Sequence, residues 1–106
     1  MNAPLQLSHT IAGEHATLSV TGRFHYEETS RFRVAYEAVL DNPAVRSIDI
    51  DLGTATYIDS SALGVMLAMR ERTRSAGKTV SLVNAHGDVR QVLLIARFDT
   101  LFRITP

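Results

Sequence analysis

The chain has no cysteine among its 106 residues, which excludes disulfides, thiolate metal sites and a cysteine nucleophile. It also lacks an excess of either charge, because Lys plus Arg and Asp plus Glu both number 11. Without a basic surplus we expect no binding to nucleic acid or to an anionic membrane surface. The start has no basic region followed by an apolar run, and no apolar run approaches a membrane span. We therefore expect a soluble, cytoplasmic protein.

Apolar residues make up 45% of the chain, enough to bury a core, and the length is usual for one domain. We expect residues 1–106 to form a single domain. Strand and helix periodicities alternate along it. The expected order is strand (5–11), strand (15–21), helix (27–40), strand (45–52), helix (59–76), strand (79–83) and helix (88–96). Residues 101–104 then form either a short final strand or a segment packed on the core.

The first two strands are separated by Gly13-Glu14, a turn signal, and should pair as a hairpin. After that hairpin, strands alternate with helices, which predicts parallel strands joined by right-handed crossovers. The expected fold class is therefore α/β. It combines a mixed, mostly parallel sheet of about four to five strands with an N-terminal hairpin and about three packed helices.

The most informative stretch is residues 57–64, Tyr-Ile-Asp-Ser-Ser-Ala-Leu-Gly, which leads into the second predicted helix. Asp and Ser are favoured at a helix start because their side-chain oxygens accept hydrogen bonds from unpaired first-turn N–H groups. The same N–H groups and the positive end of the helix dipole favour a phosphate. The segment Asp59-Ser60-Ser61 is therefore suited to a cap and to a bound or attached anion.

Together with the strand at 48–52 and the segment at 77–80, this stretch resembles the STAS domain. More narrowly, it resembles the bacterial anti-sigma factor antagonists, also called anti-anti-sigma factors. Residues 89–93 and 98–102 also resemble the last helix and tail of that family, so the resemblance covers nearly the whole chain. The motif Asp-Ser-Ser-x-Leu-Gly is fairly specific in this order of elements and weak without it.

The resemblance implies a protein–protein switch controlled by phosphorylation. In the family, the unmodified antagonist binds an anti-sigma factor that is also a serine kinase, and so frees the sigma factor. The kinase then phosphorylates the second serine of the motif, the complex falls apart, and a PP2C-type serine phosphatase resets it. Carried over by position, Ser61 is the phosphorylated residue. Asp59, Ser60, Ser61 and Gly64 form the expected partner-binding surface, with Gly64 allowing close helix packing, and the protein is expected to be a monomer.

Two positions depart from the family pattern. Ala62 stands where many relatives have glycine, and a helix should tolerate the methyl group because alanine is the better helix former. Many relatives have an acid just after the second strand, in Gly-x-Leu-Asp, whereas this chain reads Gly22-Arg23-Phe24-His25. Because that carboxylate is missing, the choice of kinase and the charge pattern of the interface stay open.

Several side chains have a simpler structural interpretation. Asp59 is equally well explained as a cap alone. Asp49 and Asp51 share one parity of a strand, and we interpret them as one structural acid near a loop and one exposed acid rather than as a catalytic pair.

The second helix is apolar nearly all round between residues 62 and 69. We place Leu63 and Leu67 in the core. Met66 and Met69 stay open between the core and a docking patch, because methionine adapts to partner surfaces.

The sequence offers no catalytic machinery. It has neither a Gly-x-Ser-x-Gly elbow nor a Gly-x-x-x-x-Gly-Lys-Ser phosphate loop, and no two of its four histidines have ligand spacing on one element. We therefore expect no enzyme activity, no metal and no cofactor, with Ser61 as the substrate of another enzyme. The rival hypothesis is a STAS scaffold or small-ligand-sensing domain in a signalling assembly, without a phosphate on Ser61.

Overall fold

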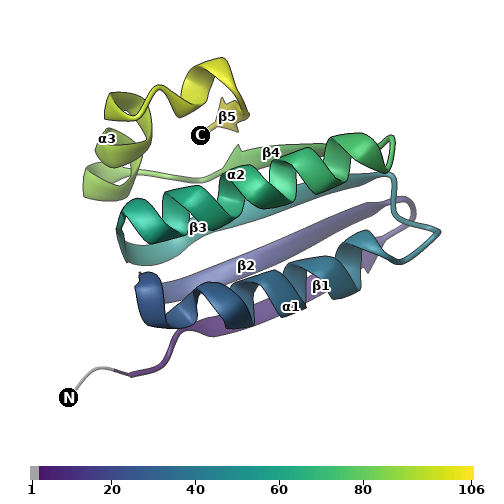
Figure 1. Ribbon diagram of the computed structural model, residues 1–106, viewed down its shortest axis with the longest axis horizontal. Helices are drawn as coiled ribbons and strands as arrows, with labels where there is room; N and C mark the ends of the chain where they lie inside the picture. Colours follow the sequence, from purple (N-terminus) through teal and green to yellow (C-terminus); the bar gives the residue numbers. More distant parts are fainter. Residues whose placement is uncertain (1–2) are drawn as a thin grey trace.

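The computed structural model describes residues 3–106 and contains strands and helices in the expected order (Figure 1). The elements are β1 (Gln6–Ala12), β2 (His15–Phe24), η1 (Tyr26–Glu28), α1 (Thr29–Leu40), β3 (Ser47–Ile58), α2 (Ser60–Ser75), β4 (Thr79–Val83), α3 (Gly87–Ile95), η2 (Phe98–Thr100) and β5 (Arg103–Thr105). The five strands form one sheet in the order β1-β2-β3-β4-β5. Strand β1 runs antiparallel to β2 and all other neighbours are parallel, which confirms the predicted α/β fold class.

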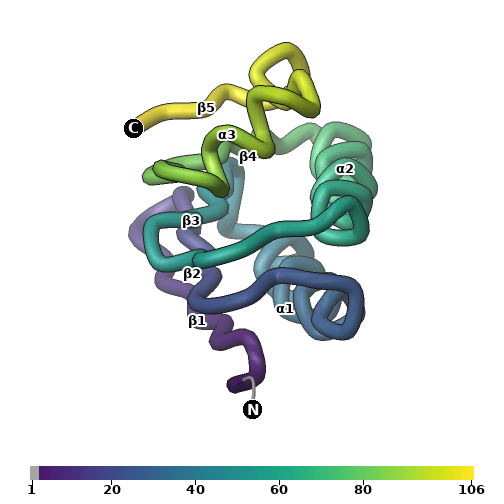
Figure 2. Tube along the Cα trace, turned by 90° about the vertical axis from the view of Figure 1, so that its left-hand side faces the viewer, coloured from purple at the N-terminus to yellow at the C-terminus, as the bar shows by residue number. Residues whose placement is uncertain are grey.

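Helices α1 and α2 lie on the same face of the sheet (Figure 2). Right-handed crossovers that proceed in one direction across a sheet put their helices on one side. The strand residues that face these helices are apolar and fully buried: Ala16, Leu18, Val20, Ile48, Ile50 and Leu52. The alternate residues of the same strands point to the opposite face, and there they are polar and partly exposed.

Strand β3 is longer than the sequence predicted, because residues 53–56 are strand rather than loop. The pairing with β2 shifts register twice, first after Ser19 opposite Asp51 and again after Gly22 opposite Ala55, and it ends with Phe24 opposite Ile58. A glycine and small polar residues suggest a loop locally, but such an irregularity lets a strand carry them while keeping its partner. The extension carries the chain directly to Asp59.

The burial of α2 differs from the expected one. Met66 is fully buried and Met69 is nearly so, whereas Leu63 and Leu67 are only partly buried at the edge of the core. Leu63 and Leu67, which we expected in the core, pack against it from its edge, and Met66 and Met69, which the sequence left open, belong to it. The buried side of α2 depends on the rotation of the helix about its own axis, which a helix that is apolar nearly all round does not encode.

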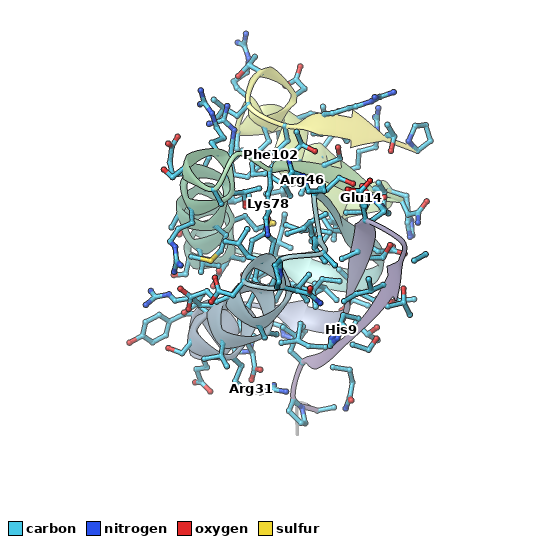
Figure 3. All side chains as sticks on the ribbon, turned by 90° about the vertical axis from the view of Figure 1, so that its right-hand side faces the viewer. His9, Glu14, Arg31, Arg46, Lys78 and Phe102 are labelled. Carbon is cyan, nitrogen blue, oxygen red and sulfur yellow. The ribbon has the colours of Figure 1, made fainter. Side chains whose placement is uncertain are left out.

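The end of α1 is held by a residue far along the chain. Lys78, which precedes β4, donates from Nζ to the backbone oxygens of Leu40 at 2.6 Å and Asn42 at 3.0 Å (Figure 3). A cation suits this place because the last helix carbonyls carry partial negative charge. Helix α1 itself starts at Thr29, later than predicted, because η1 occupies the preceding residues. Over residues 3–106, no helix is long and apolar enough to cross a membrane.

Candidate functional site

Helix α2 begins with a side-chain cap at Asp59, as the sequence predicted. Its Oδ1 accepts a hydrogen bond from the backbone N–H of Ala62 at 2.9 Å. Its Oδ2 accepts from the backbone N–H of Tyr26 at 3.0 Å, and its own N–H donates to the oxygen of Phe24 at 3.3 Å. The Asp59 carboxylate therefore joins the first turn of α2 to the start of η1, and the Asp59 N–H joins it to the end of β2.

Ser60 and Ser61 form the first turn of α2. Ser60 is exposed and Ser61 is partly buried. The first N–H groups of a helix have no partner one turn earlier, so this turn presents donors and the positive end of the helix dipole. Ser61 therefore lies near the surface, two residues after the Asp59 cap, at a position where the helix favours negative charge.

Gly64 lies one turn further along α2 and is exposed. A Cβ added at this residue would meet no atom within 4 Å among the residues that the structure describes. The expectation that Gly64 allows close helix packing within the chain is therefore wrong. Because Gly64 has no side chain, the helix backbone is exposed there next to the first turn; we call this exposed backbone the bare strip of α2.

A cation and two tyrosines lie near this turn: Arg23 and Tyr57 at the ends of β2 and β3, and Tyr26 at the start of η1. The guanidinium carbon of Arg23 lies 4.3 Å from the centre of the Tyr57 ring, a cation–π contact between register partners on β2 and β3. Tyr57 is 41% exposed, and Tyr26, whose N–H binds Asp59, is 72% exposed. The sequence did not predict the contact between Arg23 and Tyr57, because the two residues lie on different strands and are 34 positions apart along the chain.

Away from the first turn of α2, Asp51, Asp49 and His15 form structural contacts. Asp51 accepts from the N–H of Gly53 at 2.9 Å, so it is the structural acid near the irregular part of β3. Asp49 is not simply exposed: its side chain is 27% accessible and bonds to Nε2 of His15 at 3.0 Å. Between residues 3 and 106, no group of three or more His, Asp or Glu side chains is placed to hold a metal ion.

Comparison with known proteins identifies the class. A family model described as Mlab, STAS domain matches residues 7–105. A STAS-domain containing protein of Pseudomonas aeruginosa is 40% identical over 93 residues, which cover 88% of this chain and 90% of that protein. The chain therefore belongs to the STAS domain family.

Solved structures agree with this fold. An anti-sigma factor antagonist from Mycobacterium paratuberculosis superposes with a TM-score of 0.86 at 20% identity, covering all of this chain and 91% of that one. The anti-sigma factor antagonist SpoIIAA, in its unphosphorylated form, has a TM-score of 0.70 at 17% identity, covering 96% of this chain and 86% of that one. The Bacillus protein SpoIIAA in its phosphorylated form gives the same TM-score and identity, covering 96% of this chain and 91% of that one.

Proposed function

We propose that this STAS protein is an anti-sigma factor antagonist, a protein–protein switch that phosphorylation of Ser61 turns off. The unphosphorylated form binds an anti-sigma factor that is also a serine kinase and releases its target. A PP2C-type phosphatase restores the binding form. The protein is a cytoplasmic monomer without enzyme activity, and Ser61 is a substrate. The observation that carries this proposal is the place of Ser61 in the first turn of α2, near the surface and beside the Asp59 cap.

The energetics of that place favour a switch at an interface rather than a switch by unfolding. A phosphate brings about −1.5 to −2 charges at pH 7. The helix N-terminus stabilises a negative charge by about 0.3–1 kcal/mol, while repulsion from a carboxylate about 4 Å away costs about 1 kcal/mol per unit charge in water. For the whole phosphate this repulsion amounts to about 1.5–2 kcal/mol and exceeds the helix term, but both are small beside a typical unfolding free energy of about 5–15 kcal/mol. The fold should therefore survive modification.

The same phosphate should destabilise the complex with a partner more than it destabilises the fold. An ion that is taken out of water at an interface without an opposite charge costs several kcal/mol, and acidic partner groups add to that cost. The neighbouring Asp59 carboxylate already makes this part of the surface acidic, although Arg23 adds a positive charge on the adjacent strand ends. Phosphorylation should therefore abolish the complex while leaving the antagonist folded.

The test is phosphopeptide mass spectrometry of the protein from its native host, in growth and under stress. Trypsin cuts after Arg46 and Arg70, so the informative peptide spans residues 47–70 and also holds Ser47 and Ser60. Fragment ions are expected to place the phosphate on Ser61, with an occupancy that changes between conditions.

The matched controls are Ser61→Ala, which should lose the phosphopeptide, and Ser60→Ala, which should keep it. An abundant protein whose Ser61 stays unmodified in every condition would overturn the proposal.

A further inference from the structure

The face of the sheet opposite α1 and α2 carries a polar pocket of about 350 Å³. It runs from His15, Ser47 and Thr79, where β2, β3 and β4 begin, along β4 and β5 to Val83 and Thr105. Val83 pairs with Asp51, so the part of β3 from Asp51 to Ile58 separates the pocket from the first turn of α2, roughly 23 Å at about 3.3 Å per residue. The pocket is therefore distinct from the surface around Ser61 in both its face and its end of the sheet.

The strand register places an acidic residue, Asp49, and a basic residue, Arg103, on the two sides of this pocket. Asp49 on β3 pairs with Ser81 on β4, and Ser81 pairs with Arg103 on β5. Register partners on adjacent strands point to the same face, and strands lie about 4.8 Å apart, so the acid and the base are about 10 Å apart at their Cα atoms. The small Ser81 side chain between them leaves the floor of the pocket open.

The carboxylate is held in place by a chain of hydrogen bonds. Nε2 of His15 lies 3.0 Å from Oδ2 of Asp49, and Nδ1 lies 2.6 Å from Oγ of Ser47. A carboxylate only accepts, so Nε2–H donates to Asp49, and in the neutral ring Nδ1 accepts from the Ser47 hydroxyl. At the other side, Arg103 is exposed and forms no salt bridge with any of the described residues.

The Ser47–His15–Asp49 chain has the hydrogen-bond order of a hydrolytic triad but lacks an oxyanion hole. The backbone N–H of Ser47 donates to the oxygen of Glu14, and the residues after Ser47 belong to the paired strand β3. Strand N–H groups lie in the plane of the sheet, so they do not point at a substrate lying on its face. The arrangement is therefore suited to binding rather than to acyl transfer.

We propose that this pocket binds a small zwitterion of the amino-acid type. Its carboxylate would pair with the Arg103 guanidinium and its ammonium with the Asp49 carboxylate, both charge-assisted contacts. A simple anion would be attracted by Arg103 but repelled by Asp49. A simple cation would be attracted by Asp49 but repelled by Arg103. The volume lies at the small end of the range for ligand pockets, about 300–1,000 Å³, which suits a small polar molecule.

The test is a titration of the isotope-labelled full chain, followed by NMR, with each standard amino acid and with 4-aminobutyrate. The controls are butyrate, an anion alone, and butylamine, a cation alone. At least one zwitterion is expected to shift the amide signals of His15, Ser81 and Arg103 in a saturable way, without moving those of Ser60 and Ser61. Absence of saturable shifts from every zwitterion, or equal binding of butyrate or butylamine, overturns the proposal.

Substitutions then assign the site. Arg103→Gln and Asp49→Asn should each weaken binding of the active zwitterion by roughly tenfold or more, because each removes one charged partner. The matched control is Arg33→Gln, an exposed arginine on α1 on the other side of the sheet, which should bind like the wild type. Wild-type affinity in folded Arg103→Gln overturns the assignment even if Asp49→Asn does not fold. Ser61→Asp should bind the zwitterion normally, which separates this proposal from the phosphorylation switch.

Discussion

The backbone N–H of Tyr26 donates to Oδ2 of Asp59 at 3.0 Å, while Oδ1 accepts from Ala62. Both carboxylate oxygens are therefore used, and asparagine offers only one acceptor oxygen. We expect Asp59→Asn to lower the free energy of unfolding by about 1–2 kcal/mol, although asparagine caps isolated helices as well as aspartate does. Urea denaturation measures this, with Asp99→Asn as an exposed control. An unchanged urea midpoint would show that the contact with Tyr26 contributes nothing.

Ser61→Asp tests the switch itself. We expect native-like circular dichroism and a loss of affinity for the anti-sigma factor kinase of at least about tenfold, because the added charge has to be desolvated at the interface. Ser61→Ala should bind like the wild type. Ser75→Asp, at the far end of α2, is the charge-matched control and should also bind normally. Wild-type affinity in Ser61→Asp counts against the switch.

Gly64→Ala should stabilise the protein. Because a Cβ at this exposed helix position meets no described atom within 4 Å, the substitution should add about 0.5–1 kcal/mol to the free energy of unfolding through helix propensity. Thermal unfolding measures the gain.

The bulky variant Gly64→Arg should also fold but should weaken partner binding if the bare strip of α2 is part of the interface. A destabilised Gly64→Ala would mean that the position is packed after all.

Met66 and Leu67 provide a paired test of the core. Met66→Ala should cost about 2–5 kcal/mol, because it removes a fully buried side chain and leaves a cavity. Leu67→Ala should cost clearly less, because that side chain is only partly buried. Equal shifts of the urea midpoint in the two variants would contradict the observed orientation of α2.

Because the phenol of Tyr36 is buried, we expect the protein to lose stability in alkali. Burial raises the pKa of its phenol from 10.0 to about 12, against a smaller lowering by the hydrogen bond to Thr73 at 2.7 Å. Below pH 10 both states keep the proton. Between about pH 10 and 12 the unfolded chain loses it first, so the free energy of unfolding should fall by about 2–3 kcal/mol as the pH rises.

The control for this effect is Tyr36→Phe. It should cost about 1 kcal/mol at neutral pH, since Thr73 keeps its own bond to the oxygen of Met69. Its alkaline decline should be shallower than that of the wild type, as followed by urea titrations at several pH values. Equal declines would show that Tyr36 is not the group responsible.

The sequence by itself determined the features that depend on neighbouring residues. Alternating and helical periodicities specified the order of the elements and hence the α/β class, because each period reports which side chains can share one buried face. The cap at Asp59 and the place of Ser61 in the first turn were predictable for the same reason, since capping joins residues only three positions apart.

Only the tertiary structure decided the contacts between distant segments. Pairing with β2 keeps residues 53–56 in a strand despite their local preference for a loop, and the rotation of α2 about its axis buries Met66 rather than Leu67. The bond from Tyr26 to Asp59 and the chain linking Ser47, His15 and Asp49 join residues more than thirty positions apart. Such contacts depend on register and on the packing of whole elements, which no local pattern specifies.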